Sequence, residues 1–259
     1  MKHAGISKSR KTRSTFFSLS AGMLTTKGRD ETDEGLDKKL SLHYYSRMQF
    51  IKNLLPRLAK AGAVTEESSP AKSGLRSKSA SVVSVLEAGG EGPLNLDDLS
   101  LKSTYSLRNA AKHAITMTSL SMQELAASHP EVSFVHAYPR VVKTGLMRGF
   151  GTVTRVAMNA MLVLAKPWLV PLSESGDRHL YAALARGSHR GASTGGGDVV
   201  PGADGVKGIG AYLLRWDGSA ARNQKLLQEY RQNDTGKLVW EHTVGVFESI
   251  CGKDGVSQD

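Results

Sequence analysis

Proton-transfer chemistry is suggested by the stretch KSTYSLRNAAKHAI, residues 102–115, in which a tyrosine stands at the start of a predicted helix. A tyrosine hydroxyl can exchange a proton with a substrate oxygen, but its usual pKa of ~10 calls for a neighbouring cation. One helical turn after Tyr105 stands the neutral Asn109. Lys112 shares that helical face, although a rise of about 1.5 Å per residue places it ~10 Å further along the axis. Tyr105 is therefore the best candidate acid or base, although no cation is expected close enough to lower its pKa strongly.

The same kinds of residue also fit a purely structural role, and both interpretations stay open. A tyrosine near a helix start can be a packed aromatic residue whose hydroxyl is solvated. Ser84 could polarise a carbonyl group from the end of a strand. Between Val83 and Val85, however, it also fits the simple alternation of strand side chains.

Four apolar runs of strand length alternate with longer helical patterns. The strands are predicted at residues 16–22, 80–86, 132–139 and 208–216. The helices are predicted at 28–58 (closing near Pro56), 105–127, within 146–186, 220–231 and 236–250, with loops at 62–80 and 187–208. This alternation is typical of a parallel α/β sheet, in which ligands bind beyond the carboxyl ends of the strands. Candidate site residues should therefore follow the strands.

The length of the chain fits one large domain or two small ones. At 259 residues, 40% of them hydrophobic, the chain can bury a sizeable core. The single cysteine, Cys251, excludes an internal disulfide framework and favours a reducing, cytoplasmic location. The most apolar run, residues 156–172, is interrupted by Lys166 and two prolines, so we predict no membrane span.

The net charge of +10 raises the question of nucleic-acid binding. Part of that charge lies in residues 1–14, which lack apolar periodicity and are predicted to form a basic disordered tail. No RNP, zinc-finger or helix-turn-helix signature accompanies the charge. We therefore predict no nucleic-acid partner, and binding through the basic tail stays a weaker alternative.

The order of five sequence landmarks resembles the short-chain dehydrogenase/reductase family. In that family they are a strand ending in an Asn-Asn-Ala-Gly turn, the long helix after it, a strand ending with the catalytic serine, the helix of a Tyr-x-x-x-Lys motif, and a Pro-Gly turn with a threonine that contacts the cofactor. The matching stretches are FSLSAG (17–22), LHYYSRMQFIKNLLP (42–56), VVSVLEAGG (82–90), TYSLRNAAKHAITMTSLSMQELA (104–126) and FVHAYPRVVKTGL (134–146). The local amino-acid sequence around these landmarks also resembles a divergent branch of the family that is common in filamentous fungi and often found in secondary-metabolite pathways.

The resemblance implies a fold, an activity and a set of site residues. The implied fold is an incomplete Rossmann-like three-layer α/β sandwich with a parallel sheet, formed as one domain by residues 15–259 and entered at about the fourth strand of the family fold. The implied activity is NAD(P)-dependent oxidoreduction of a small carbonyl or alcohol. The implied site residues are Tyr105, Ser84 and Asn109 for catalysis, and Ala21, Gly22, Pro139 and Thr144 for cofactor binding.

The departures from the family pattern bear on activity. Nothing before Phe16 supplies the family's Gly-x-x-x-Gly-x-Gly loop, on which the cofactor pyrophosphate rests. The substituted positions are Asn109 for lysine, His43 for asparagine, Leu86 or Glu87 for serine, and Arg140 for the glycine of the Pro-Gly turn. The family cofactor is NADP or NAD. We expect this N-terminally shortened chain to bind little or none of it and to be catalytically weak or inactive.

The same shortening would leave residues 15–21, a central strand in the family, at an exposed apolar edge. Such an edge favours pairing, so we expect a homo-oligomer or a partner that covers it. A non-catalytic scaffold or interaction protein that keeps the core stays an open alternative to the enzyme, and binding of NADPH separates the two hypotheses.

Overall fold

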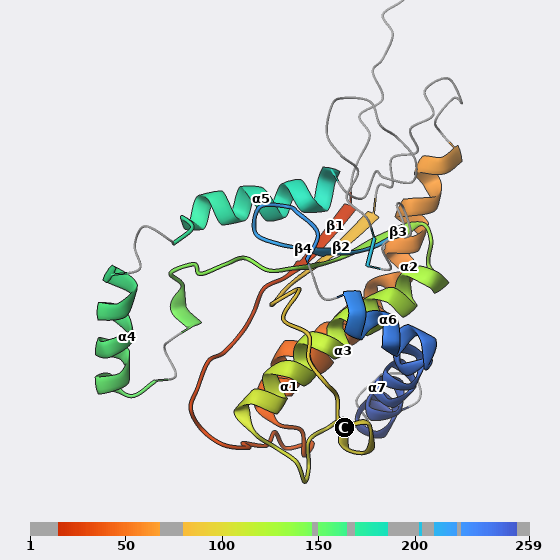
Figure 1. Ribbon diagram of the computed structural model, residues 1–259. Helices are drawn as coiled ribbons and strands as arrows, with labels where there is room; N and C mark the ends of the chain where they lie inside the picture. The colour runs from red at the N-terminus through yellow and green to blue at the C-terminus, as the bar shows by residue number, and fades with distance from the viewer. Residues whose placement is uncertain are drawn as a thin grey trace, which may run out of the picture.

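Four parallel strands form the centre of the molecule (Figure 1). The computed structural model describes residues 15–67, 80–146, 150–164, 169–185, 202–203, 210–221 and 224–252. The strands are β1 (Thr15–Leu19), β2 (Ala80–Val85), β3 (Val132–Ala137) and β4 (Ala211–Leu214), side by side in that order. The predicted parallel sheet is confirmed, although each strand is shorter than its apolar run because the flanking residues belong to the adjoining loops. The predicted basic tail, residues 1–14, and most of the predicted loop 187–208 lie outside the described residues.

Helices cover both faces of the sheet. They are α1 (Lys38–Leu40), α2 (Ser46–Glu67), α3 (Leu107–Ser128), α4 (Thr152–Leu164), α5 (Leu172–Ala185), α6 (Gln224–Gln232) and α7 (Thr235–Cys251), with a π-helical turn at Ser41–Tyr45 and a 3-10 turn at Leu96–Asp98. Strand side chains alternate between two cores. Val82 and Phe134 belong to the core with α2, α3 and α7, whereas Val83 and Val135 pack with α5. The result is a three-layer α/β sandwich, with α4 standing away from the sheet (Figure 1).

None of the helices in the described part of the chain is both long enough and apolar enough to cross a bilayer.

The first helical region begins later than its acidic residues predict. It starts at Lys38 rather than at Gly28, because Asp37 caps it. Asp37 Oδ1 accepts hydrogen bonds from the backbone N–H groups of Lys39 and Leu40, at 3.0 Å and 3.2 Å. The acidic residues upstream therefore form a loop.

The same region also ends later than predicted. Pro56 lies inside α2, which continues to Glu67, so the predicted loop at 62–80 begins as helix. A proline inside a helix removes one backbone hydrogen bond and crowds the preceding turn. Leu55 and Leu58 beside it are buried in the core, and their burial offsets that loss.

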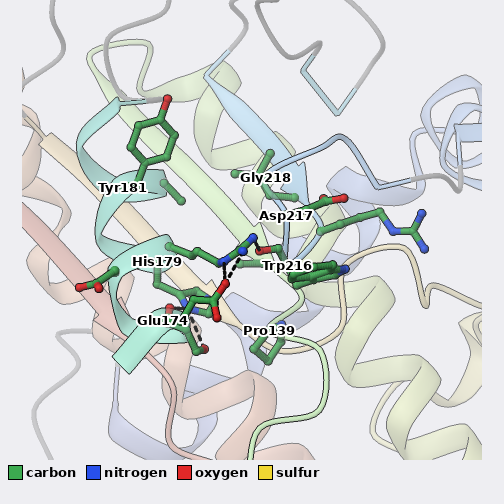
Figure 2. A pocket seen from close by; sticks show the side chains of 14 residues that line it. Pro139, Glu174, His179, Tyr181, Trp216, Asp217 and Gly218 are labelled. Carbon is green, nitrogen blue, oxygen red and sulfur yellow. Dashed lines mark hydrogen bonds and ion pairs between the residues drawn. The ribbon is translucent and has the colours of Figure 1, made fainter. Parts of the chain in front are cut away.

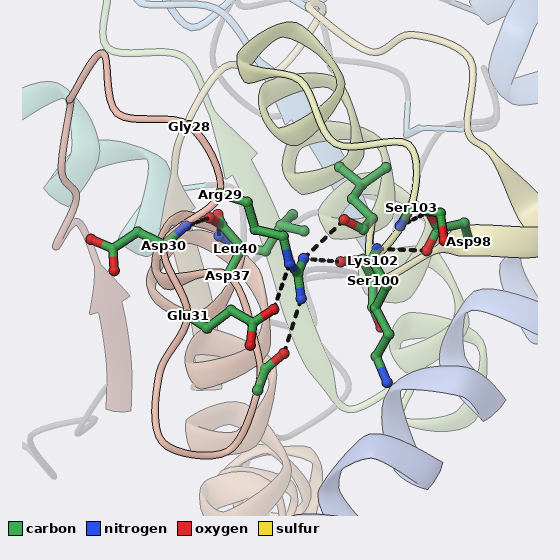
Figure 3. Close-up of polar contacts among 12 residues, drawn as sticks. Gly28, Arg29, Asp30, Glu31, Asp37, Leu40, Asp98, Ser100, Lys102 and Ser103 are labelled. Carbon is green, nitrogen blue, oxygen red and sulfur yellow. Dashed lines mark hydrogen bonds and ion pairs between the residues drawn. The ribbon is translucent and has the colours of Figure 1, made fainter.

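The loop between β1 and α1 is fastened to the loop before α3 by Arg29 (Figure 3). The Arg29 guanidinium donates to the carbonyls of Leu101, at 2.9 Å, and Ser100, at 3.2 Å. Asp98 accepts hydrogen bonds from the backbone N–H groups of residues 102–104 at 2.7–2.9 Å. Desolvation alone would raise the pKa of Asp98, but these bonds outweigh it and lower the pKa to about 2. The segment that leads into α3 is therefore well anchored.

A chain of hydroxyl groups joins three helical segments inside the larger core. The buried Tyr44 hydroxyl lies 2.7 Å from Ser121 Oγ and 2.5 Å from Thr243 Oγ1. Thr243 also donates to the Val239 carbonyl at 2.7 Å. Burial raises the pKa of Tyr44 above its usual value, so the phenol stays a neutral hydrogen-bonding group.

β1 forms the exposed edge that the sequence predicts. Among the described strands it pairs with β2 alone. Phe16 keeps 46% of its surface exposed, and Phe17 contacts the exposed Phe50 of α2 with ring centroids 6.3 Å apart. The oligomer or partner expected at this edge stays a prediction.

The turn after β3 contains a residue in an unfavourable backbone conformation. Arg140 has a φ of 63°, in the left-handed region that favours glycine. Its guanidinium carbon lies 4.6 Å from the centre of the Trp216 ring, and that of Arg178 lies 4.6 Å from the same ring. This cation–π contact stabilises a backbone shape that arginine by itself disfavours.

We predict that Tyr44→Phe lowers the free energy of unfolding by about 1–2 kcal/mol, because the Ser121 and Thr243 hydroxyls lose a buried partner. Urea denaturation followed by circular dichroism measures the change. Tyr181→Phe is the control, since Tyr181 is 63% exposed and should unfold as the wild type does. Equal midpoints for the two variants would contradict a stabilising role for the hydroxyl chain.

We also predict that Arg140→Gly is more stable than Arg140→Ala by about 1 kcal/mol. Both variants lose the contact with Trp216, but only glycine relieves the left-handed backbone strain. Thermal unfolding of the pair isolates the strain from the stacking. Identical stabilities would show that the turn relaxes when the arginine is removed.

Candidate active site

The larger of two neighbouring cavities opens at the carboxyl ends of β1, β2 and β3, the edge at which parallel α/β sheets bind ligands. Its volume is about 920 Å³. Of the predicted cofactor residues, Gly22, Pro139 and Thr144 line it, from the loops after β1 and β3. Ala21 is not among its lining residues, and its carbonyl accepts a hydrogen bond from Arg47 Nη2 at 2.6 Å.

Gly22 keeps part of this cavity open. A β-carbon at this position would lie 3.3 Å from His43 Nε2 and 3.5 Å from Leu146 Cδ1. A larger side chain would therefore project among residues that line the same cavity. The small residue at the end of β1 thus permits a ligand to approach the backbone closely.

Arg47 of α2 holds the ends of β1 and β2 together at one wall of the cavity. Only 3% of its surface is exposed. Its Nη1 donates to Ser84 Oγ at 2.9 Å and to the Val85 carbonyl at 2.8 Å, while Nη2 reaches Ala21. Burial lowers the pKa of Arg47 to about 10, which still leaves it charged near neutral pH. The predicted catalytic Ser84 is therefore fully buried against Arg47 and does not line the cavity.

His43 lines the cavity from the π-helical turn that precedes α2. Its Nε2 accepts a hydrogen bond from the Met23 backbone N–H at 3.0 Å, which assigns the ring proton to Nδ1. Burial and the nearby charge of Arg47 lower the pKa of His43 to about 4. The ring is therefore neutral near pH 7, and it positions the loop after β1.

Tyr105 lies just before α3 rather than on it, because Ser106 is the helix N-cap. Its hydroxyl is buried, and Tyr105 lines neither cavity. Lys39 of α1 lies with its Nζ 5.3 Å from the centre of the tyrosine ring. Burial alone would lower the pKa of Lys39, but Tyr105 and Asp37 outweigh it and raise that pKa.

The cation beside Tyr105 is thus Lys39, which our sequence analysis missed. The pair is separated by 66 residues of chain, so helical spacing carries no signal for it.

Asn109 and Lys112 have partners of their own. The Asn109 side chain donates to the Thr104 carbonyl at 2.8 Å and helps to close the start of α3. Lys112 Nζ donates to the Gly90 carbonyl at 2.5 Å, in the loop after β2. Since Tyr105 precedes the helix, the shared helical face expected from a seven-residue spacing does not form.

The smaller cavity, of about 340 Å³, lies between α5 and the segments after β3 and β4 (Figure 2). Arg178 is fixed there by an ion pair with Glu174 and by a hydrogen bond to the Trp216 carbonyl at 3.1 Å. Pro139, Ser175 and His179 line both cavities. The two cavities are therefore neighbours along one edge of the sheet.

His179 of α5 stands where the two cavities adjoin, and our sequence analysis missed it. Its Nδ1 lies 2.6 Å from the Ser175 carbonyl, one helical turn earlier. That contact requires the proton on Nδ1 and leaves Nε2 without a hydrogen bond to another of the described residues. Only its place on α5 reveals it, because a lone histidine in a polar helical segment carries no sequence signal.

The described residues contain no group of three or more histidine, cysteine or acidic side chains able to hold a metal ion.

The comparisons with known proteins agree with the landmarks in the sequence. No family model matches the chain. It is 40% identical over 242 residues to oxidoreductase AN1596 of Emericella nidulans, which covers 90% of this chain and 68% of that protein. It is 36% identical over 246 residues to oxidoreductase andH of Emericella variicolor, covering 90% and 67%.

A third relative carries the family name. The chain is 29% identical over 237 residues to the short-chain dehydrogenase/reductase SAT2 of Stachybotrys chartarum, covering 86% of this chain and 62% of that protein. The chain thus spans about two thirds of the length of these relatives. With its parallel sheet and the landmarks at the strand ends, the chain belongs to the short-chain dehydrogenase/reductase family.

Proposed function

We propose that the chain carries the nicotinamide side of an NAD(P)-dependent oxidoreductase site, which interconverts a small carbonyl compound and its alcohol in secondary metabolism. The expectation of weak or absent cofactor binding, drawn from the missing glycine-rich loop, is the opposing hypothesis, and the NADPH titration described below decides between the two. The relatives are named as oxidoreductases, and their names do not favour the scaffold alternative. The role in secondary metabolism rests on the resemblance to a fungal branch of the family.

The observation that carries this proposal is the convergence of Gly22, Pro139 and Thr144 on one cavity. They come from loops after two different strands, and the resemblance assigns all three to cofactor contact. Gly22 also leaves room for a ligand in this cavity, because a β-carbon at that position would crowd His43 and Leu146, which line it as well.

Different residues of the cavity would make different contributions to binding a nicotinamide cofactor. That cofactor supplies or accepts the hydride when it is bound. Gly22 would allow its close approach, and Pro139 and Thr144 would contact it from the other wall. Arg47 and Arg140 add positive charge to the cavity, which favours an anionic ligand.

Two further parts of the proposal concern the surroundings of the molecule. A cytoplasmic location rests on the single cysteine, Cys251, which is free. A second copy or another partner at the exposed edge of β1 rests on the unpaired side of that strand. The substrate is a small molecule, with no role for nucleic acid or a membrane.

We predict that Gly22→Val weakens binding of NADPH at least tenfold, because the added side chain projects toward His43 and Leu146 in the cavity. Fluorescence titration of NADPH into the purified protein measures the affinity. Gly28→Val is the matched control on the same loop, since a β-carbon there meets nothing within 4 Å. Binding to the wild type that Gly22→Val leaves unchanged would place the cofactor elsewhere, and no binding to the wild type would refute the proposal.

A further inference from the structure

The proposed reaction needs a group that exchanges a proton with the substrate oxygen, and this inference rests on that proposed function. The residues predicted for this task do not line the cavities. Tyr105 and Asn109 line neither of them, and the Tyr105 hydroxyl is buried. Ser84 is fully buried and accepts a hydrogen bond from Arg47.

Several ionisable groups do line the larger cavity, but their chemistry is unsuited to proton exchange. His43 uses its Nε2 lone pair to accept the Met23 N–H, and burial keeps the ring neutral. Arg47 and Arg140 carry guanidinium groups, which do not give up a proton in proteins. Glu87 is exposed to solvent on the loop after β2.

Unlike the other ionisable groups that line the larger cavity, His179 keeps one ring nitrogen available for proton exchange. His179 is partly exposed and lines both cavities together with Pro139. Figure 2 shows both residues at the smaller cavity. The Ser175 carbonyl, 2.6 Å away, holds the proton on Nδ1. Nε2 is then the ring nitrogen with an unused lone pair, through which the ring can take up and release a second proton.

We propose that His179, rather than Tyr105, is the catalytic acid and base of this site. In reduction, the carbonyl carbon of the substrate would take up the hydride that a bound, reduced nicotinamide cofactor supplies. The carbonyl oxygen takes the proton from Nε2 of the His179 imidazolium. The ring is left neutral with its proton on Nδ1, the form that Ser175 stabilises. Oxidation of the alcohol reverses each transfer.

The position of the ring proton tests this assignment without any turnover. Long-range proton–nitrogen NMR correlations report which nitrogen of a neutral histidine is protonated, and a spectrum of His179→Gln assigns the signal. We expect His179 to carry its proton on Nδ1. A neutral ring protonated on Nε2 would overturn the proposal, because the nitrogen available to the cavities would then lack its lone pair.

Variants test the role in catalysis. We expect His179→Ala to bind NADPH as the wild type does but to reduce a panel of small aldehydes and ketones at least ~100-fold more slowly, the usual worth of general acid–base catalysis. Added free imidazole should restore part of the rate, which a merely structural role would not allow. His129→Ala is the matched control, since His129 follows α3, contacts Glu131 and lines neither cavity.

The contrary outcomes are distinct. Full turnover by His179→Ala together with loss of turnover in Tyr105→Phe would return the acid–base role to the tyrosine and leave the proposed function standing. Loss of both NADPH binding and turnover in His179→Ala, without imidazole rescue, would make His179 a binding residue only. A wild type that neither binds NADPH nor reduces any compound of the panel would refute the proposed function, and this assignment with it.

Discussion

The architecture of the site depends on one buried cation. Arg47 places a guanidinium between α2 and the ends of β1 and β2, and it meets no carboxylate among the described residues. Its charge is stabilised by two backbone carbonyls and the Ser84 hydroxyl. Leaving a buried charge without such partners is strongly unfavourable, so the strand ends must stay close to the helix. The loops that continue from those ends form two walls of the larger cavity.

The remaining walls follow from the direction of the sheet. Because all four strands run parallel, the loops after β1, β2 and β3 meet at one edge. The long connection from β3 to β4 returns over the other face as α5, which brings His179 and Ser175 to the same edge. Residues far apart in the chain thus become neighbours through the connectivity of the sheet.

Much of the fold could be predicted from the sequence, because burial imposes a period on strands and helices. The four strands and the order of helices are of this kind, whereas the cap at Asp37 and the passage of α2 through Pro56 depend on local bonds and packing that periodicity does not contain. Fewer residues of the site could be predicted from the sequence. Gly22, Pro139 and Thr144 follow strands and could be anticipated, but the contact of Lys39 with Tyr105 and the position of His179 arise only when distant elements pack. Arg47 did leave a signal, since it falls on the buried helical face between Tyr44 and Met48.

The π-helical turn at Ser41–Tyr45 allows the residue at the cavity wall to change through the loss of one residue from the chain as well as through a substitution. A π turn holds one residue more than an α-helical turn. Deleting one residue there would leave a regular helix, and the segments on either side would keep nearly the same orientation, because a π turn carries its extra residue through about the same rotation as an α-helical turn. The anchoring of α2 through Arg47 would be kept, while a different side chain would take the place of His43 beside Gly22. A single-codon insertion or deletion in this turn is therefore a route by which related proteins can exchange the residue at the cavity wall without altering the wall itself.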